Sequence, residues 1–169
     1  GEIVARVAGV GNASPFAKAG VMIRQGVNTD SRNAFLAVTR SSGIRFTSRT
    51  AAGKSTDSIA STGAAPVWLR LTRSGSTFTA YKSPDGTHWS QIGTRTISMT
   101  NPVLIGLAVT AHNAAALNSS VFDHVKITRA APTTRAAITA AAGNAAPATA
   151  ESSTTTAAGA RAAGGVPWA

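Results

Sequence analysis

The sequence predicts an all-β sandwich of two antiparallel sheets over residues 1–129, and three observations support this prediction. Side chains alternate between apolar and polar with a period of two in most segments from residue 2 to residue 128. Gly, Asn, Asp, Ser and Pro separate these segments at intervals of about ten residues, which is typical of sandwiches and barrels. No window in this range has a convincing helical period.

Four strands are expected in the first fifty residues, at about 2–8, 18–24, 35–39 and 44–49. Successive side chains of a strand point to opposite faces of its sheet. In the fourth of these strands, Ile44 and Phe46 therefore face one way, whereas Arg45 and Arg49 face the other. The pattern indicates strands with one buried and one polar face.

The clearest element is a β-hairpin over residues 68–82, with its turn at Ser74-Gly75-Ser76. Further strands are expected at about 89–92, 103–110 and 122–127. The segment 103–110 differs from the others because Leu104 and Ala108 make its second face apolar as well. Since strands covered on both faces are apolar throughout, we expect 103–110 to be a central strand.

Composition limits the classes of function. The formal net charge is +10, but the 12 arginines are scattered singly, so the clustering that nucleic-acid binding requires is missing. The absence of cysteine excludes disulfides, thiolate nucleophiles and cysteine-based zinc sites. No run of about 18 apolar residues is present, so we expect no membrane-spanning helix.

Residues 130–169 have a different composition from the rest of the chain. Of these 40 residues, 17 are Ala, 9 are Ser or Thr, 4 are Gly and 3 are Pro. Only Ile138, Val166 and Trp168 are large and apolar, so the segment cannot bury enough surface to offset the entropy of ordering it. We expect residues 130–169 to be a disordered, low-complexity Ala/Thr-rich linker.

Four parts of the sequence carry a resemblance to a known family. They are 17–24 (AKAGVMIR), 67–75 (VWLRLTRSG), 77–93 with 102–112 (TFTAYKSPDGTHWSQIG and PVLIGLAVTAH), and 121–127 (VFDHVKI). In this order they resemble the concanavalin A-like jelly-roll module of secreted bacterial proteins, such as the C-terminal module of β-xylosidase-type glycoside hydrolases. The resemblance covers roughly residues 1–128 and implies a two-sheet antiparallel jelly-roll sandwich. It also implies a secreted or cell-surface location in a bacterial multidomain protein.

The resemblance also implies what flanks the module. Members of the family usually have one or two strands upstream of the segment that matches residues 1–7, so we expect the sandwich to lack its N-terminal strand or strands. The final Val166-Pro167-Trp168-Ala169 is similar to the entry of another such module. Neighbouring domains of the parent chain are therefore expected partners.

Catalysis is not expected. Glycoside hydrolysis normally uses two carboxylates across one cleft. The sandwich segment has five acidic residues, and no two lie within twenty residues of each other: Glu2, Asp30, Asp57, Asp85 and Asp123. A glycoside hydrolase fragment is therefore the weakest alternative. The three histidines, His88, His112 and His124, lack the spacing of metal ligands, so we predict no cofactor.

Two of the acidic residues have structural interpretations. The segment 83–89 (SPDGTHW) resembles the Asp-box of sialidases with one spacer residue missing, a motif whose aspartate caps its own turn. Asp123 lies among apolar residues, and we expect it on the same face as Val121, Val125 and Ile127. A hydrogen bond or ion pair to a neighbouring strand or loop would satisfy its charge. A structural Ca²⁺ ligand is the weaker alternative.

The candidate binding site is a surface rather than a motif. If the strands pair in sequence order, Arg45 and Arg49 share a face with Trp68, Arg70 and Tyr81. Sugar rings stack on aromatic faces, and arginine donates hydrogen bonds to hydroxyls and carboxylates. We therefore predict a non-catalytic accessory module that binds polysaccharide or cell-surface glycan on this face. The alternative is a structural spacer or a protein–protein adhesion module, in which Trp68 is only packed.

Overall fold

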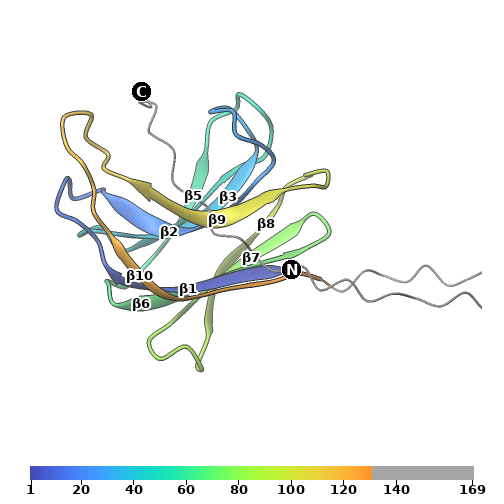
Figure 1. The fold of residues 1–169 in the computed structure, drawn as a ribbon. Helices are drawn as coiled ribbons and strands as arrows, with labels where there is room; N and C mark the ends of the chain where they lie inside the picture. The colour runs from blue at the N-terminus through green and yellow to red at the C-terminus, as the bar shows by residue number, and fades with distance from the viewer. Residues whose placement is uncertain (131–169) are drawn as a thin grey trace, which may run out of the picture. The chain divides into compact units, whose positions relative to one another are not determined.

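The structure, a computed structural model, describes residues 1–130. All the regular secondary structure in this range is β-strand. The strands are β1 (Glu2–Gly9), β2 (Lys18–Arg24), β3 (Asn33–Thr39), β4 (Ile44–Arg49), β5 (Asp57–Ser61), β6 (Val67–Ser74), β7 (Thr77–Ser83), β8 (Ser90–Thr96), β9 (Leu104–Thr110) and β10 (Val121–Thr128). They form two antiparallel five-stranded sheets (Figure 1). The predicted two-sheet antiparallel sandwich is confirmed. The expected linker and the module entry at 166–169 lie outside the described residues.

The first sheet, sheet A, has the strand order β10-β1-β6-β7-β8, and the second, sheet B, has the order β5-β4-β3-β2-β9. Only the hairpin β6–β7 was predicted with its partner, and it is confirmed with Ser74 opposite Thr77. Its turn is Gly75-Ser76, and Gly75 has a φ of 60°, which glycine adopts without strain.

The core lies between the two sheets and is built from the alternate side chains of each strand. Its largest fully buried side chains come from both layers: Phe46, Phe78, Ile3, Ile23, Leu36, Ile44, Leu69 and Leu71. The alternation in the sequence therefore separates the inner from the outer face correctly. Burial of these apolar surfaces is the dominant favourable contribution to folding.

The prediction that 103–110 is a central strand is wrong. The segment forms β9, which pairs only with β2 and lies at the edge of sheet B. The strand that is buried on both faces is β3, where Phe35, Ala37 and Thr39 of the outer face are covered as well as the inner face. Apolar side chains on both faces of β9 reflect an uncovered edge instead.

This edge of the sandwich is open. Strand β9 ends sheet B and β10 ends sheet A, and the neighbours β2 and β1 pack across the core from each other, so β9 and β10 lie at the same side (Figure 1). Leu107 and Val109 pair with buried residues of β2, yet they are 44% and 45% exposed. Ile127 of β10 is opposite buried Ile3 and is 49% exposed. Inward-facing apolar side chains therefore remain in contact with solvent there.

Candidate glycan-binding groove

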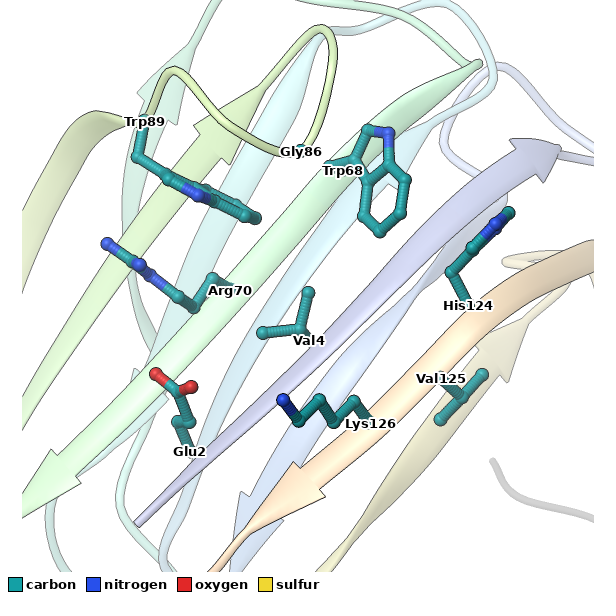
Figure 2. Close-up of a pocket in the computed structure, with 9 residues that line it drawn as sticks. All are labelled: Glu2, Val4, Trp68, Arg70, Gly86, Trp89, His124, Val125 and Lys126. Carbon is teal, nitrogen blue, oxygen red and sulfur yellow. The ribbon is translucent and has the colours of Figure 1, made fainter.

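A groove of about 590 Å³ lies on the outer face of sheet A, within the usual size range of ligand sites. Nine residues from β1, β6, β10 and the β7–β8 loop line it: Glu2, Val4, Trp68, Arg70, Gly86, Trp89, His124, Val125 and Lys126 (Figure 2). Strands β10, β1 and β6 are neighbours in the sheet, so their outward side chains stand in adjacent rows. The groove combines two indole rings, an apolar floor and several cations.

Trp68 projects from β6 because its neighbours Val67 and Leu69 point into the core. Its indole is half-buried, between the β7–β8 loop and β10. A side chain at Gly86 would place its Cβ 2.9 Å from Cε2 of the ring, so the loop can only approach Trp68 this closely with glycine. On the β10 side, the ring of His124 lies with its centroid 4.9 Å from that of Trp68.

The β7–β8 loop is held by an aspartate that caps its own turn. Asp85 Oδ1 accepts hydrogen bonds from the backbone N–H groups of Thr87 and His88, both at 2.8 Å. Ser83 is buried, and its hydroxyl accepts a hydrogen bond from the backbone N–H of Gly86 at 2.8 Å. The predicted capping role of Asp85 is confirmed. The turn thereby places Gly86 against Trp68.

Charge reinforces this turn. Nδ1 of His88 lies 2.6 Å from Oδ2 of Asp85. The hydrogen bonds from the backbone and ring of His88, with that from the Thr87 backbone, lower the pKa of Asp85 well below its ordinary value. The hydrogen bond and the negative charge of Asp85 in turn raise the pKa of His88 above its ordinary value of 6.5.

We expect the turn to be most stable in mildly acidic solution. The raised pKa of His88 contributes to the stability of the folded state. This contribution is complete below pH 6.5 and is lost as the pH rises through the pKa of His88 in the folded protein. The lowered pKa of Asp85 makes a second contribution to stability. It is present above pH 3.8 and is lost only as the pH falls through the pKa of Asp85 in the folded protein. NMR titration of His88 should show a midpoint above 6.5, which Asp85→Asn returns toward 6.5. Asp123→Asn is the control, and an unchanged midpoint in Asp85→Asn would contradict the pairing.

Arg70 lies between two aromatic rings. Its Cζ atom is 4.3 Å from the ring centroid of Tyr81 and 4.5 Å from that of Trp89. Tyr81 is directly opposite Arg70 on β7, and Trp89 comes from the end of the β7–β8 loop. Figure 2 shows the guanidinium stacked on the indole of Trp89. Cation–π attraction of this kind orients the guanidinium plane.

Strand β10 completes the groove through an irregular register. The pairing with β1 shifts between Val4 and Arg6, and His124 has a φ of 51°. The extra residue turns Asp123 outward, where it accepts a hydrogen bond from Nη1 of Arg6 at 2.6 Å. His124 also contacts Asp123 at 2.9 Å, and the hydrogen bonds from His124 and Arg6 lower the pKa of Asp123.

The predicted surroundings of Asp123 are partly wrong. Ile127 is opposite buried Ile3, whereas Asp123 is opposite outward-facing Arg6, so Asp123 and Ile127 do not share a face. The register shift is the cause, because one additional residue reverses the alternation. The predicted ion pair to a neighbouring strand is confirmed by Arg6. Among residues 1–130, no three His, Asp or Glu side chains are grouped so that they could hold a metal ion.

Three of the five predicted site residues lie together, and two do not. Trp68, Arg70 and Tyr81 are neighbours on the outer face of sheet A. Arg45 and Arg49 belong to β4, which lies in sheet B. The prediction that they share a face with Trp68 is wrong because β6 pairs with β1 and β7 and not with β4.

The outer face of sheet B has its own basic character. Arg49 donates a hydrogen bond to the carbonyl oxygen of Thr29 at 2.6 Å, so its charge is used to hold the β2–β3 loop. Arg45 is half-buried. The burial of Lys18, and to a lesser extent the nearby charge of Arg45, lower the pKa of Lys18. No aromatic pair of the kind around Arg70 accompanies Arg45 among the described residues.

Several groove residues were not predicted: Glu2, Val4, Gly86, Trp89, His124, Val125 and Lys126. Most of them enter the site because β1 pairs with both β6 and β10, strands that lie far from it in sequence. Trp89 had a local signal, the turn at 83–89, but its stacking on Arg70 depends on the β6–β7–β8 order.

No protein-family model matches this chain, and no curated protein matches it. Two solved structures are similar in fold. One is a functionally unknown protein from Saccharomyces cerevisiae, at 16% identity and a TM-score of 0.54 over 77% of this chain and 68% of that chain. The other is the GH43 protein BlXynB mutant (K247S) from Bacillus licheniformis, at 12% identity and a TM-score of 0.57 over 72% of this chain. This chain spans 26% of that protein.

These similarities establish a shared β-sandwich fold. Fold alone does not determine function, so the function must be argued from the groove. In residues 1–130 there is no helix long and apolar enough to span a membrane.

Proposed function

We propose that this module is a non-catalytic accessory domain that binds polysaccharide or cell-surface glycan in the groove on sheet A. Because such ligands lie outside the cell, the proposal places the module in a secreted or surface-attached protein. The observation that supports it most directly is the partly exposed indole of Trp68 beside Arg70 in one groove. An aromatic ring offers a sugar a stacking surface, and arginine offers it hydrogen-bond donors.

The lining of the groove supports binding rather than hydrolysis. A single carboxylate, that of Glu2, is among the nine lining residues, whereas glycosidases normally place two across the scissile bond. Asp123, the nearest further acid on β10, is already bonded to Arg6 and His124. The similarity of fold to a GH43 protein is compatible with a role in carbohydrate recognition.

A second candidate, a protein–protein adhesion or spacer module, is favoured by the open edge at β9 and β10. Strand β9 has no charged residue, no proline and an unbroken register with β2. Proteins usually protect edge strands with charged side chains, prolines or β-bulges, and β9 has none of these. An edge that presents Leu107 and Val109 therefore suits packing against another protein segment.

We expect Trp68→Ala to weaken retention on a binding polysaccharide by at least about tenfold, which corresponds to about 1.4 kcal/mol. The loss follows from removing both the stacking surface and its buried apolar area. Affinity electrophoresis through a panel of neutral and acidic polysaccharides measures the retention. Trp68→Tyr keeps a ring and should keep most of the binding.

Phe16→Ala is the matched control, because Phe16 is a 46% exposed aromatic residue outside the groove that contacts His112. It should leave retention unchanged. Thermal unfolding of each variant shows whether the fold is intact. If Trp68→Ala is folded and retained as well as the unmodified protein, or if no polysaccharide retards the unmodified protein, the glycan proposal fails and the adhesion candidate is favoured.

A further inference from the structure

Arg70 has hydrogen-bonding capacity that the described part of the protein does not use. Two other arginines of sheet A are engaged: Arg6 bonds Asp123, and Arg73 donates to Gly75, Asn101 and Met99. No hydrogen bond and no ion pair within residues 1–130 involves the side chain of Arg70. Its Nε is buried without a partner, whereas Nη1 and Nη2 are not among the buried unpartnered atoms. The two terminal nitrogens therefore remain available at the groove.

The two aromatic contacts determine where those donors can act. The Cζ atom of Arg70 lies over the rings of Tyr81 and Trp89 at 4.3 and 4.5 Å, and Figure 2 shows the Trp89 indole stacked on the guanidinium, so these contacts restrict its orientation. Hydrogen bonds from a guanidinium lie in its plane, and its terminal nitrogens form a fork that matches two carboxylate oxygens. A guanidinium that is already oriented loses little entropy when it binds such a group. The arrangement suits a planar anion better than a single hydroxyl.

The charges around Arg70 are consistent with an anionic ligand. Lys126 of β10 lines the same groove, and the ring of His124 lies beside that of Trp68. The only acidic lining residue is Glu2, which Figure 2 places away from Trp68, at the end of the groove where the side chains of Arg70 and Lys126 also lie. Between Trp68 and Lys126 the floor is the apolar side chain of Val4. A sugar ring on this floor would therefore have cations on both sides of it.

We propose that the groove is selective for carboxylated sugars, and that Arg70 binds the uronate carboxylate through Nη1 and Nη2. The inference rests on the proposed glycan-binding function and names its ligand class. Trp68 contributes the stacking surface, and Lys126 adds long-range attraction. Neutral polysaccharides would then bind only through the ring, and more weakly.

The test compares two polymers with the same backbone, polygalacturonate oligosaccharides and their methyl esters, by isothermal titration calorimetry in about 0.15 M salt. We expect the acid to bind at least about tenfold more tightly than the ester. Arg70→Gln should weaken binding of the acid by at least about tenfold, because a charge-assisted bidentate contact is lost. Arg70→Lys keeps the charge but not the fork, and should lose about threefold to tenfold.

Arg45→Gln is the matched control. Arg45 is also a half-buried strand arginine without a hydrogen bond among the described residues, but it lies on sheet B, and its substitution changes the net charge equally. It should change the affinity less than about twofold, since distant charges are screened at this salt concentration. Thermal unfolding confirms that each variant is folded, and Arg70→Lys remains informative if Arg70→Gln unfolds.

The possible failures are distinguishable. If Arg70→Gln and Arg45→Gln weaken binding of the acid equally, the attraction comes from net charge and the assignment of Arg70 is wrong. If the ester binds as tightly as the acid and Trp68→Ala weakens both, the groove takes neutral sugars, so selectivity fails while the proposed function survives. If neither these polymers nor any other polysaccharide binds, the proposed function fails as well.

Discussion

Gly20→Ala should destabilise the protein by about 3 kcal/mol or more, whereas Gly106→Ala should change stability by no more than about 0.5 kcal/mol. The two glycines lie on adjacent strands of sheet B, β2 and β9. A Cβ at Gly20 would lie 2.0 Å from the carbonyl oxygen of Leu36 and 2.5 Å from the Cα of Ala37. Both atoms belong to the backbone of β3, so no side-chain rotation can relieve the overlap.

Strand β2 would have to separate from β3, to which it is paired along its whole length. A Cβ at Gly106 has no atom within 4 Å, and removing a glycine there also reduces the entropy of the unfolded chain. Urea unfolding of both variants measures the difference through the midpoint at constant m-value. Equal midpoints would show that β2 and β3 are not packed as closely as the structure has them.

The side-chain alternation predicted the layers of the sandwich but not the order of its strands. A period of two identifies which residues of one strand share a face. It carries no information on which strand lies beside which, and this is why Arg45 was placed next to Trp68. Strand β5 was missed altogether, because it is only five residues long, Asp57–Ser61, and most of these residues are polar and exposed. Pairing between distant strands is decided by the whole fold.

The candidate site shows the same division. The hairpin β6–β7 was predictable from the turn at Gly75, and it brings Arg70 opposite Tyr81. The contribution of Lys126 and His124 was not, since it depends on β10 pairing with β1 through a register shift. A bulge of one residue leaves little trace in a sequence, although it decides that Asp123 faces outward.

Leu36→Ala should cost about 2–5 kcal/mol, and Leu107→Ala about 1 kcal/mol or less. Both leucines point inward from sheet B, but Leu36 of β3 is fully buried and Leu107 of β9 is 44% exposed. Truncating Leu36 leaves a cavity among side chains that cannot collapse, whereas truncating Leu107 removes apolar area that is already half hydrated. Equilibrium unfolding at several protein concentrations measures both.

The comparison also distinguishes the two candidate functions. If Leu107→Ala costs nearly as much as Leu36→Ala, and the cost grows with protein concentration, then a second copy covers the β9 edge in solution, because association stabilises a fold by mass action. That result would contradict the open edge and would favour the adhesion module. A small cost that does not depend on concentration means that the protein by itself leaves this edge in water, so that adhesion through β9 would require a different protein as partner.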